Sequence, residues 1–170
     1  MHWILTRRLS HKFLLIGFLV VLMLGVPSML FLERAWTGLA QLDREVAGLA
    51  PAQALTALAR QTAQHRGLAN GLLNGDDKVA DARTAAADKA QTLQTELQRA
   101  LAVFGDAALT ERATRLGTEQ AALVQAVQAR ALAAPESFAR HTALIDAQLA
   151  LLYDLTRSAK LVLHPAPAGY

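Results

Sequence analysis

The stretch RQTAQHRGLANGLLNGDD, residues 60–77, ends one amphipathic helix and begins the next. Asn74 and Gly75 favour a helix C-terminus, because both tolerate the left-handed backbone that commonly closes a helix. Either Asp76 or Asp77 can then accept hydrogen bonds from the first N–H groups of the following helix. A connection this short makes neighbouring helices antiparallel, so the stretch predicts packed helices.

Apolar residues recur at spacings of three and four on both sides of this stretch, which is typical of helices with one packed face. Gly105 and Asp106 repeat the stop-and-cap signal, and Pro135 suits the first position of a helix. The predicted helices cover residues 33–73, with an interruption near Pro51, 78–104, 107–133 and 135–160. Their predicted core faces are Leu55, Leu58, Thr62, His65, Ala69 and Leu72; Val79, Ala86, Ala90, Leu93, Leu97, Leu101 and Phe104; Leu109, Ala113, Leu116, Leu123, Val127 and Leu132; and Phe138, Ile145, Leu149, Leu152 and Leu155.

A separate apolar segment precedes these helices. Residues 13–32, FLLIGFLVVLMLGVPSMLFL, contain no charged side chain, and about 20 apolar residues cross a bilayer as a helix. The flank at residues 1–12 is basic and lacks acidic residues, which favours a cytoplasmic N-terminus. The alternative is a cleavable signal peptide, whose apolar region is usually shorter, about 7–15 residues. We expect an all-α protein: an N-terminal transmembrane helix in the bacterial inner membrane, followed by an antiparallel up-down four-helix bundle, with residues 33–170 in the periplasm.

The composition agrees with packed helices and excludes several kinds of site. Apolar residues make up 53% of the 170 residues but aromatic residues only 5%, a balance that favours helices over sheets. The chain has no cysteine, which excludes disulfides, thiolate metal sites and c-type haem attachment. Arg7, Arg8 and Lys12 account for the net charge of +3, because no acidic residue precedes Glu33. Without a basic face interleaved with aromatic residues, nucleic acid is not an expected partner.

The first helix after the membrane segment is longer than the helix that follows it. At about 1.5 Å per residue, the first spans about 60 Å and the second returns about 40 Å. Residues 33–48 are therefore expected to extend below the bundle domain, residues 49–160, as a helical neck without partners in this chain. Leu42, Val46 and Leu49 form an apolar stripe on the neck, which a second copy of the chain or a returning segment would cover. We expect a homodimer.

The predicted core face of the first helix contains polar residues. Thr62 and His65 lie on the face itself and Arg66 lies beside it, and the fourth helix has a similar pair in Arg140 and His141. An arginine offers a planar fork of donors to an anion, and neutral polar side chains can orient the ligand. The candidate ligand-binding residues are Gln61, Thr62, His65, Arg66, Asn70, Arg140 and His141.

Alternative interpretations of the two histidines remain open. Histidines on an apolar face are more often hydrogen-bonded core residues that fix the register of a bundle. A metal site is not expected, because His65 and His141 lack a third ligand. A b-type haem is not expected either, since the methionines other than Met1 lie in the membrane segment. With no phosphate loop, nucleophile elbow or zinc-protease motif, we expect no enzyme and no cofactor.

The chain resembles the extracytoplasmic sensor region of bacterial transmembrane receptors in three segments: QTAQHRGLANGLLNGDD, PESFARHTALI and LVLHPAPAGY. These receptors include methyl-accepting chemotaxis proteins, sensor kinases and diguanylate cyclases. The first segment is also similar to nitrate- and nitrite-sensing helical domains, where a Gln-x-Glu-Arg-Gly-type helix carries an anion-binding arginine. By position that arginine matches Arg66, and His65 replaces the Glu. The resemblance covers most of residues 1–170 and implies that the chain continues beyond the final segment, residues 161–170, to a second membrane helix and an output domain.

The expected function is that of a membrane-anchored periplasmic sensory module in chemotaxis or another form of signal transduction. Its expected partner is a small ligand with an anionic group, or a periplasmic binding protein. The alternative is a membrane-anchored helical scaffold or interaction protein without a small-molecule ligand. The two interpretations differ in whether Thr62, His65 and Arg66 are bonded within the chain or line an open crevice.

Overall fold

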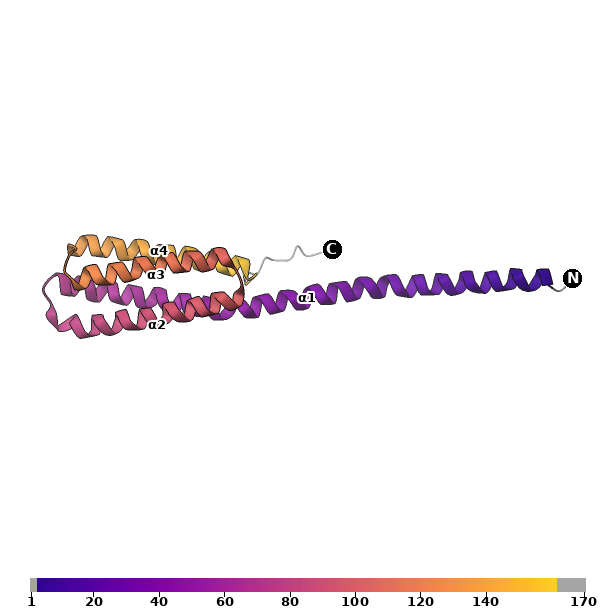
Figure 1. Ribbon diagram of the computed structural model, residues 1–170, viewed down its shortest axis with the longest axis horizontal. Helices are drawn as coiled ribbons and strands as arrows, with labels where there is room; N and C mark the ends of the chain where they lie inside the picture. The colour runs from indigo at the N-terminus through magenta and orange to yellow at the C-terminus, as the bar shows by residue number, and fades with distance from the viewer. Residues whose placement is uncertain (1–2, 162–170) are drawn as a thin grey trace, which may run out of the picture. The chain divides into compact units, whose positions relative to one another are not determined.

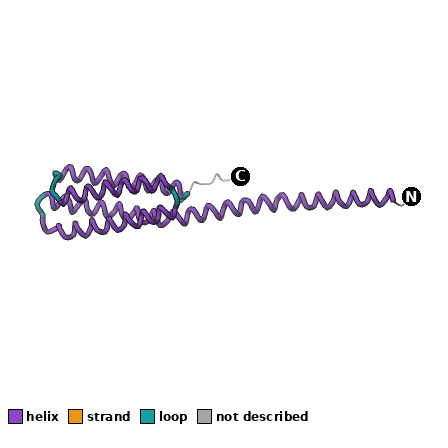
Figure 2. Tube along the Cα trace, viewed as in Figure 1, coloured by secondary structure: helices purple, strands orange, loops and turns teal. Residues whose placement is uncertain are grey.

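A computed structural model of the protein describes residues 3–161, apart from the side chains at positions 3–10, 35 and 37–41. The described residues form helices and no strand (Figures 1 and 2), which confirms the all-α prediction. Of the predicted final segment, residues 161–170, all but residue 161 lie outside the described residues.

The chain divides into two compact units, Met1–Leu42 and Asp43–Tyr170. Helix α1 (Trp3–Leu73) contributes to both. In the first unit, the segment His11–Arg34 is apolar and without buried residues, and its length of about 36 Å is enough to cross a bilayer. One candidate membrane helix thus lies near the N-terminus, where residues 13–32 are predicted to form one, although a signal sequence has the same features.

In the second unit, the C-terminal part of α1 lies beside three further long helices (Figures 1 and 2). They are α2 (Ala80–Phe104), α3 (Ala107–Gln128) and α4 (Ala134–Ser158), and one 3₁₀ turn, η1 (Asp77–Val79), precedes α2. Helix α2 packs against α3, and α3 packs against α4.

Helices α1 and α4 are antiparallel where they touch. The backbone of Gly48 lies against Ala159 at the end of α4, whereas Arg66 donates a hydrogen bond to Thr142, close to the start of α4. Residue numbers in α4 therefore fall as those in α1 rise. With the short connections between the helices, this arrangement is compatible with the predicted antiparallel four-helix bundle.

The core of the second unit consists of two apolar clusters. The first draws on all four helices and contains Leu55, Leu58, Ala90, Leu97, Leu101, Phe104, Leu109, Ala113, Leu151, Leu155 and Ala159. The second contains Ala69, Leu72, Leu123, Val127 and Leu144, with Val79 and Ala80 packed against it. A buried leucine contributes about 1.5–3 kcal/mol, and an alanine methyl contributes less. Because six buried core residues are alanines, the core is thin and the helices approach closely.

The ends of α1 and α2 follow the predicted chemistry. Gly75 and Gly105 adopt φ angles of +94° and +79°, which glycine adopts without strain. The carboxylate of Asp76 accepts a hydrogen bond from the N–H of Lys78, and Asp106 caps α3 in the same way. Both predicted stop-and-cap signals are therefore confirmed.

The predicted end of α3 is wrong. The helix ends at Gln128 rather than near Ala133, because Arg130 adopts a left-handed φ of +51°. The N–H of Ala131 then donates to the carbonyl of Ala126 at 2.9 Å, the bond that closes a Schellman-type helix end. Glycine usually occupies this left-handed position, so an arginine there gives no sequence signal.

Two prolines also differ from the prediction. Helix α1 continues through Pro51, so the predicted interruption is wrong. The proline is among the fully buried side chains, and its packing offsets the backbone hydrogen bond that it cannot donate. Pro135 is the second residue of α4 rather than the first.

Helix α4 presents a different face to the core than the sequence predicts. Its buried residues are Ser137, His141, Leu144, Gln148, Leu151 and Leu155. The predicted core residues Phe138 and Leu149 are instead 46% and 49% exposed. Adjacent residues on a helix point about 100° apart, so the predicted stripe is rotated by one residue. Leu155 and His141, which the sequence also places on the core face, are common to both faces. The error arose because the true face includes two polar residues besides the histidine.

The prediction that the neck, residues 33–48, has no partner in the chain is wrong for its C-terminal end, which contacts α4. The Nε of Arg44 donates to the carbonyl of Ser158 at 3.0 Å. The apolar stripe is not covered by these contacts: Leu42 is 56% exposed, Val46 65% and Leu49 48%.

Candidate functional site

Buried polar side chains interrupt the apolar core of the second unit. They are Gln61, Thr62 and His65 of α1, Arg83 and Gln94 of α2, Gln120 of α3, and Ser137, His141 and Gln148 of α4. The whole predicted core face of α1, from Leu55 to Leu72, is buried, so the placement of Thr62 and His65 on that face is confirmed. All four helices thus contribute polar groups to the interior.

Two histidines form a direct bond between α1 and α4. Nδ1 of His65 lies 2.8 Å from Nε2 of His141. Nδ1 of His141 lies 2.7 Å from the carbonyl oxygen of Ser137, and a carbonyl only accepts, so this nitrogen carries the proton. In a neutral imidazole Nε2 of His141 is then an acceptor, and Nδ1 of His65 donates to it. The remaining nitrogen, Nε2 of His65, is a buried acceptor without a hydrogen-bond partner.

Both imidazoles are held neutral. Burial, with smaller contributions from His141 and Arg83, lowers the pKa of His65 from 6.5 to about 4. Burial also lowers the pKa of His141; the hydrogen bond to Ser137 opposes this effect, and the charge of Arg66 adds to it. A proton on either ring would place a charge in the interior, so the pair is uncharged at neutral pH.

Arg83 of α2 is the functional candidate that the sequence analysis missed. The residue is 4% exposed. Its Nη2 donates to the hydroxyl of Thr84 at 3.2 Å, whereas Nε and Nη1 are buried without a hydrogen-bond partner. None of the ion pairs among the described residues includes it. A buried guanidinium normally has a carboxylate partner, so this arginine is exceptional.

A second polar group joins three helices through amides. Nε2 of Gln148 lies 3.2 Å from the hydroxyl of Thr62 and 3.2 Å from Oε1 of Gln120. The Thr62 hydroxyl in turn donates to the carbonyl of Leu58 at 3.0 Å. Gln94 of α2 donates to the backbone of α3. These bonds fix the helices in one register.

Arg66 lies at the edge between α1 and α4 rather than in the interior. Its Nη1 donates to the hydroxyl of Thr142 at 3.0 Å, and the guanidinium stacks 4.5 Å from the ring centre of Phe138. The side chain is half-buried. A guanidinium has five N–H donors, so a ligand at this edge would find donors that the bond to Thr142 does not use.

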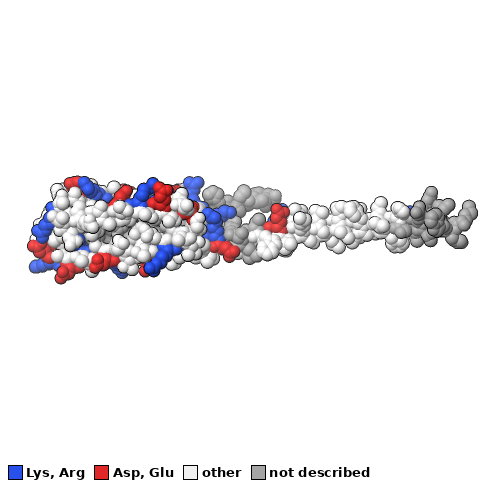
Figure 3. Space-filling view, in the orientation of Figure 1, with Lys and Arg blue, Asp and Glu red and all other residues white. Residues whose placement is uncertain are grey.

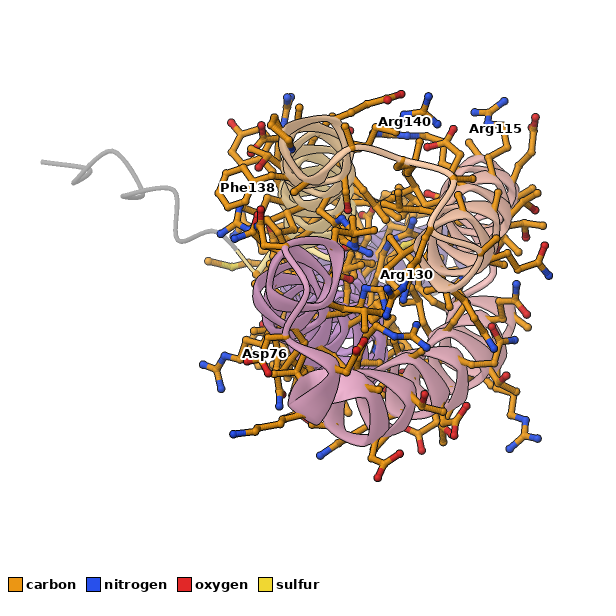
Figure 4. The ribbon with its side chains drawn as sticks, turned by 90° about the vertical axis from the view of Figure 1, so that its left-hand side faces the viewer. Asp76, Arg115, Arg130, Phe138 and Arg140 are labelled. Carbon is orange, nitrogen blue, oxygen red and sulfur yellow. The ribbon has the colours of Figure 1, made fainter. Side chains whose placement is uncertain are left out.

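The other predicted site residues do not join Arg66. Arg140 lines a surface pocket of ≈ 360 Å³ between α3 and α4 and pairs with Glu136 at 2.6 Å. Figure 4 shows Phe138 and Arg140 on different sides of α4. Asn70 accepts a bond from Asn74 at the end of α1.

Gln61 also stands apart from these contacts. It is buried and donates to Gln64 of its own helix at 3.2 Å. The seven predicted site residues therefore divide among the interior, the α1–α4 edge, the end of α1 and the α3–α4 groove.

Two of the missed residues, Arg83 and Gln120, left a trace in the sequence. The predicted core faces of α2 and α3 each contained a step of seven residues, from Val79 to Ala86 and from Leu116 to Leu123. Arg83 and Gln120 fill these steps as four plus three. A step of seven in an apolar stripe therefore signals a polar residue on the core face.

Charges on the surface of the second unit are mixed in sign, and neither sign forms a continuous patch on the face seen in Figure 3. Among the described residues, no three His, Asp or Glu side chains are grouped so that they could hold a metal ion. Comparisons with protein-family models, curated proteins and solved structures found no match to this chain.

Proposed function

We propose that the chain is the sensory module of a bacterial transmembrane receptor. In this proposal His11–Arg34 anchors the chain in the inner membrane, the N-terminus is cytoplasmic, and the second unit is a periplasmic antiparallel four-helix bundle. The bundle senses a small ligand with an anionic group and acts in chemotaxis or another signalling pathway. No catalytic residue is assigned.

The observation that supports the proposal is that α1 carries both the apolar segment and the polar contacts to α4. Thr62, His65 and Arg66 all contact α4 side chains. Each contact is a directional hydrogen bond between side chains, so a ligand that competes for one of them changes the free energy of the α1–α4 contact. When the free energy of a helix–helix contact changes, packed helices shift by small distances between discrete arrangements. The helix that shifts is the one that contains the membrane segment.

The ligand-binding group in this proposal is Arg66. It is half-buried and therefore reachable, and Phe138 holds its guanidinium by stacking. An anion that accepted two bonds from the guanidinium would use its free donors and would also compete with Thr142 for Nη1. A charge-assisted hydrogen bond of this kind contributes about 1.5–3 kcal/mol, or about ten- to a hundredfold in affinity.

A structural observation favours the alternative function, a scaffold without a ligand. Thr62, His65 and Arg66 each make a hydrogen bond within the chain, as residues that fix the register of a bundle do. The exposed stripe at Leu42, Val46 and Leu49 suits assembly with a second copy in either function.

A thermal-unfolding screen of residues 1–170 in detergent micelles separates the two functions. We expect a compound among small anions, amino acids and carboxylates to raise the melting temperature. Arg66→Gln, which keeps much of the side-chain length but not the charge, should weaken binding of that compound about ten- to a hundredfold. Arg60→Gln, at an exposed position on the same helix, is the matched control and should bind like the parent. If no compound stabilises the parent, the scaffold function replaces the sensory one.

A further inference from the structure

We infer that Arg83, together with His65, forms an interior binding site for one small monovalent anion, separate from the site proposed at Arg66. The site lies inside the second unit, between α1 and α2, with His141 of α4 behind His65. It belongs to a different group of side chains from Arg66, which is bonded at the α1–α4 edge.

The first observation is the state of Arg83. Only 4% of Arg83 is exposed, yet two of its three guanidinium nitrogens have no hydrogen-bond partner. Leaving a charged donor buried and unpaired is among the most unfavourable arrangements in a protein interior. The chemistry that relieves it is an anion or a strong acceptor, and Thr84 supplies only one neutral hydroxyl.

The second observation is independent of the first. Nε2 of His65 is also buried and unpartnered, at 2% exposure of the residue. The positive charge of Arg83 is close enough to contribute to the lowered pKa of this imidazole. The interior of the second unit therefore contains unused N–H donors on Arg83 and an unused acceptor on His65.

The protonation state of His65 determines which kind of ligand this site can bind. The bond to His141 leaves Nε2 of His65 as an acceptor, and an acceptor repels an anion. Binding therefore requires one proton from solution, either on Nε2 of His65 or on the anion as an acid O–H. With the proton in place, the anion accepts from Arg83 and shares the proton with His65. The proton and the anion enter together, so the net charge of the site stays that of Arg83.

This linkage gives the site a pH dependence. The ionisable groups that act on His65 are Arg83 of α2 and His141 of α4, and Arg66 acts on His141. The buried side chains of α3 are Leu109, Ala113, Gln120, Leu123 and Val127, none of which titrates. Uptake of one proton strengthens binding by up to about tenfold for each unit that the pH falls, as long as the pH stays above the pKa of about 4 of the free histidine.

The test measures anion binding to residues 1–170 in detergent micelles at constant ionic strength. Sodium gluconate, whose anion is too bulky for a buried site, is replaced by sodium formate, acetate or chloride. We expect at least one of the three to raise the melting temperature of the parent at pH 5.5. The dissociation constant should increase up to about tenfold at pH 6.5.

Matched variants locate the effect. Arg83→Met removes the charge but keeps an unbranched side chain, and should abolish the response to the small anion. Arg99→Met, at an exposed position of α2, should respond like the parent. An equal response of Arg83→Met and the parent overturns the inference, as does a parent that does not distinguish any small anion from gluconate. If such a parent is still stabilised by another compound through Arg66, the interior site is wrong and the sensory function stands.

A second measurement does not depend on whether Arg83→Met folds. Long-range ¹H–¹⁵N correlation spectra of the parent report which imidazole nitrogens carry protons, and His65→Gln assigns the signal of His65. Without the anion, Nε2 of His65 should show an unprotonated resonance at pH 5.5. Adding the anion that stabilises the parent should shift this resonance to the hydrogen-bonded or protonated form, and an unchanged resonance overturns the inference.

Discussion

His65 donates its single N–H to His141, so the bond between α1 and α4 at 2.8 Å joins two neutral rings. His141 can accept this bond only because its own proton is directed to the carbonyl of Ser137. The bond therefore depends on the protonation of both rings, and an added proton changes the donor pattern.

Acid should destabilise the protein through this pair. The pKa of His65 is about 4 in the folded chain and 6.5 when unfolded, so the unfolded chain binds the extra proton first. The histidine's contribution is complete above pH 6.5 and is lost as the pH falls from 6.5 to 4. The loss amounts to up to about 3 kcal/mol.

Urea unfolding of the parent and of His65→Leu at several pH values tests this expectation. The variant lacks the titrating ring but shares all other ionisable groups. The difference in unfolding free energy between parent and variant should decrease from pH 6.5 to pH 4. A constant difference would show that His65 does not titrate in this range.

Two glycines of α1 should respond to alanine in opposite directions. A methyl group at Gly48 would overlap the side chain of Ala159, and overpacking of this kind costs about 1–3 kcal/mol. A methyl group at Gly67 meets no atom within 4 Å, so Gly67→Ala should stabilise the helix by about 0.5–1 kcal/mol. Thermal unfolding of the two variants measures both effects. Equal melting temperatures of Gly48→Ala and Gly67→Ala would contradict the close contact between Gly48 and Ala159.

The exposed stripe at Leu42, Val46 and Leu49 should lie at the contact between two copies of the chain. Single cysteines at these positions should crosslink in membranes, because the chain has no other cysteine and parallel copies bring identical residues together. Val103→Cys, at an apolar position of α2 that is 82% exposed, is the control and should remain uncrosslinked. Crosslinking at Val103 alone would place the contact on another surface.

The proposed orientation is tested with reporter fusions after Tyr170. With a cytoplasmic N-terminus and one membrane crossing, a reporter enzyme that is active only in the periplasm should be active. A reporter that works only in the cytoplasm should be inactive in the same fusion. The reverse pattern would refute the proposed orientation. A fusion protein that has lost its N-terminal segment and is absent from the membrane fraction would identify a cleaved signal peptide instead.

Much of the fold follows from local sequence rules. Glycine at a helix end and aspartate at the next helix start act within one turn, so positions 75, 76, 105 and 106 are readable without tertiary contacts. The core face of α1 is also readable, because four of its six residues are leucine or alanine. Tertiary packing decided the rest. Arg130 closes α3 in a conformation that arginine rarely adopts.

The candidate site was less readable for the same physical reason. The sequence identified His65 and His141 but gave no information on which ring nitrogen faces which helix. Arg83 was not among the candidate residues, since arginine is seldom buried without a partner. Only the packing of α2 against its neighbours places it in the interior. Arg140, in contrast, was grouped with the site by sequence proximity to His141, although adjacent helical residues point in different directions.

The alanines of the core have a mechanical consequence. Ala69, Ala86, Ala90 and Ala113 are buried where helices approach, and alanine has no side-chain torsion that can change to another rotamer. A leucine-filled interior can absorb a displacement of one helix by rearranging its side chains. An interior with many alanines has fewer side-chain rearrangements available. A displacement of α1 therefore moves the neighbouring helices as whole units. The second unit should therefore transmit a displacement of α1 as rigid-body motion of its helices rather than absorb it by repacking side chains.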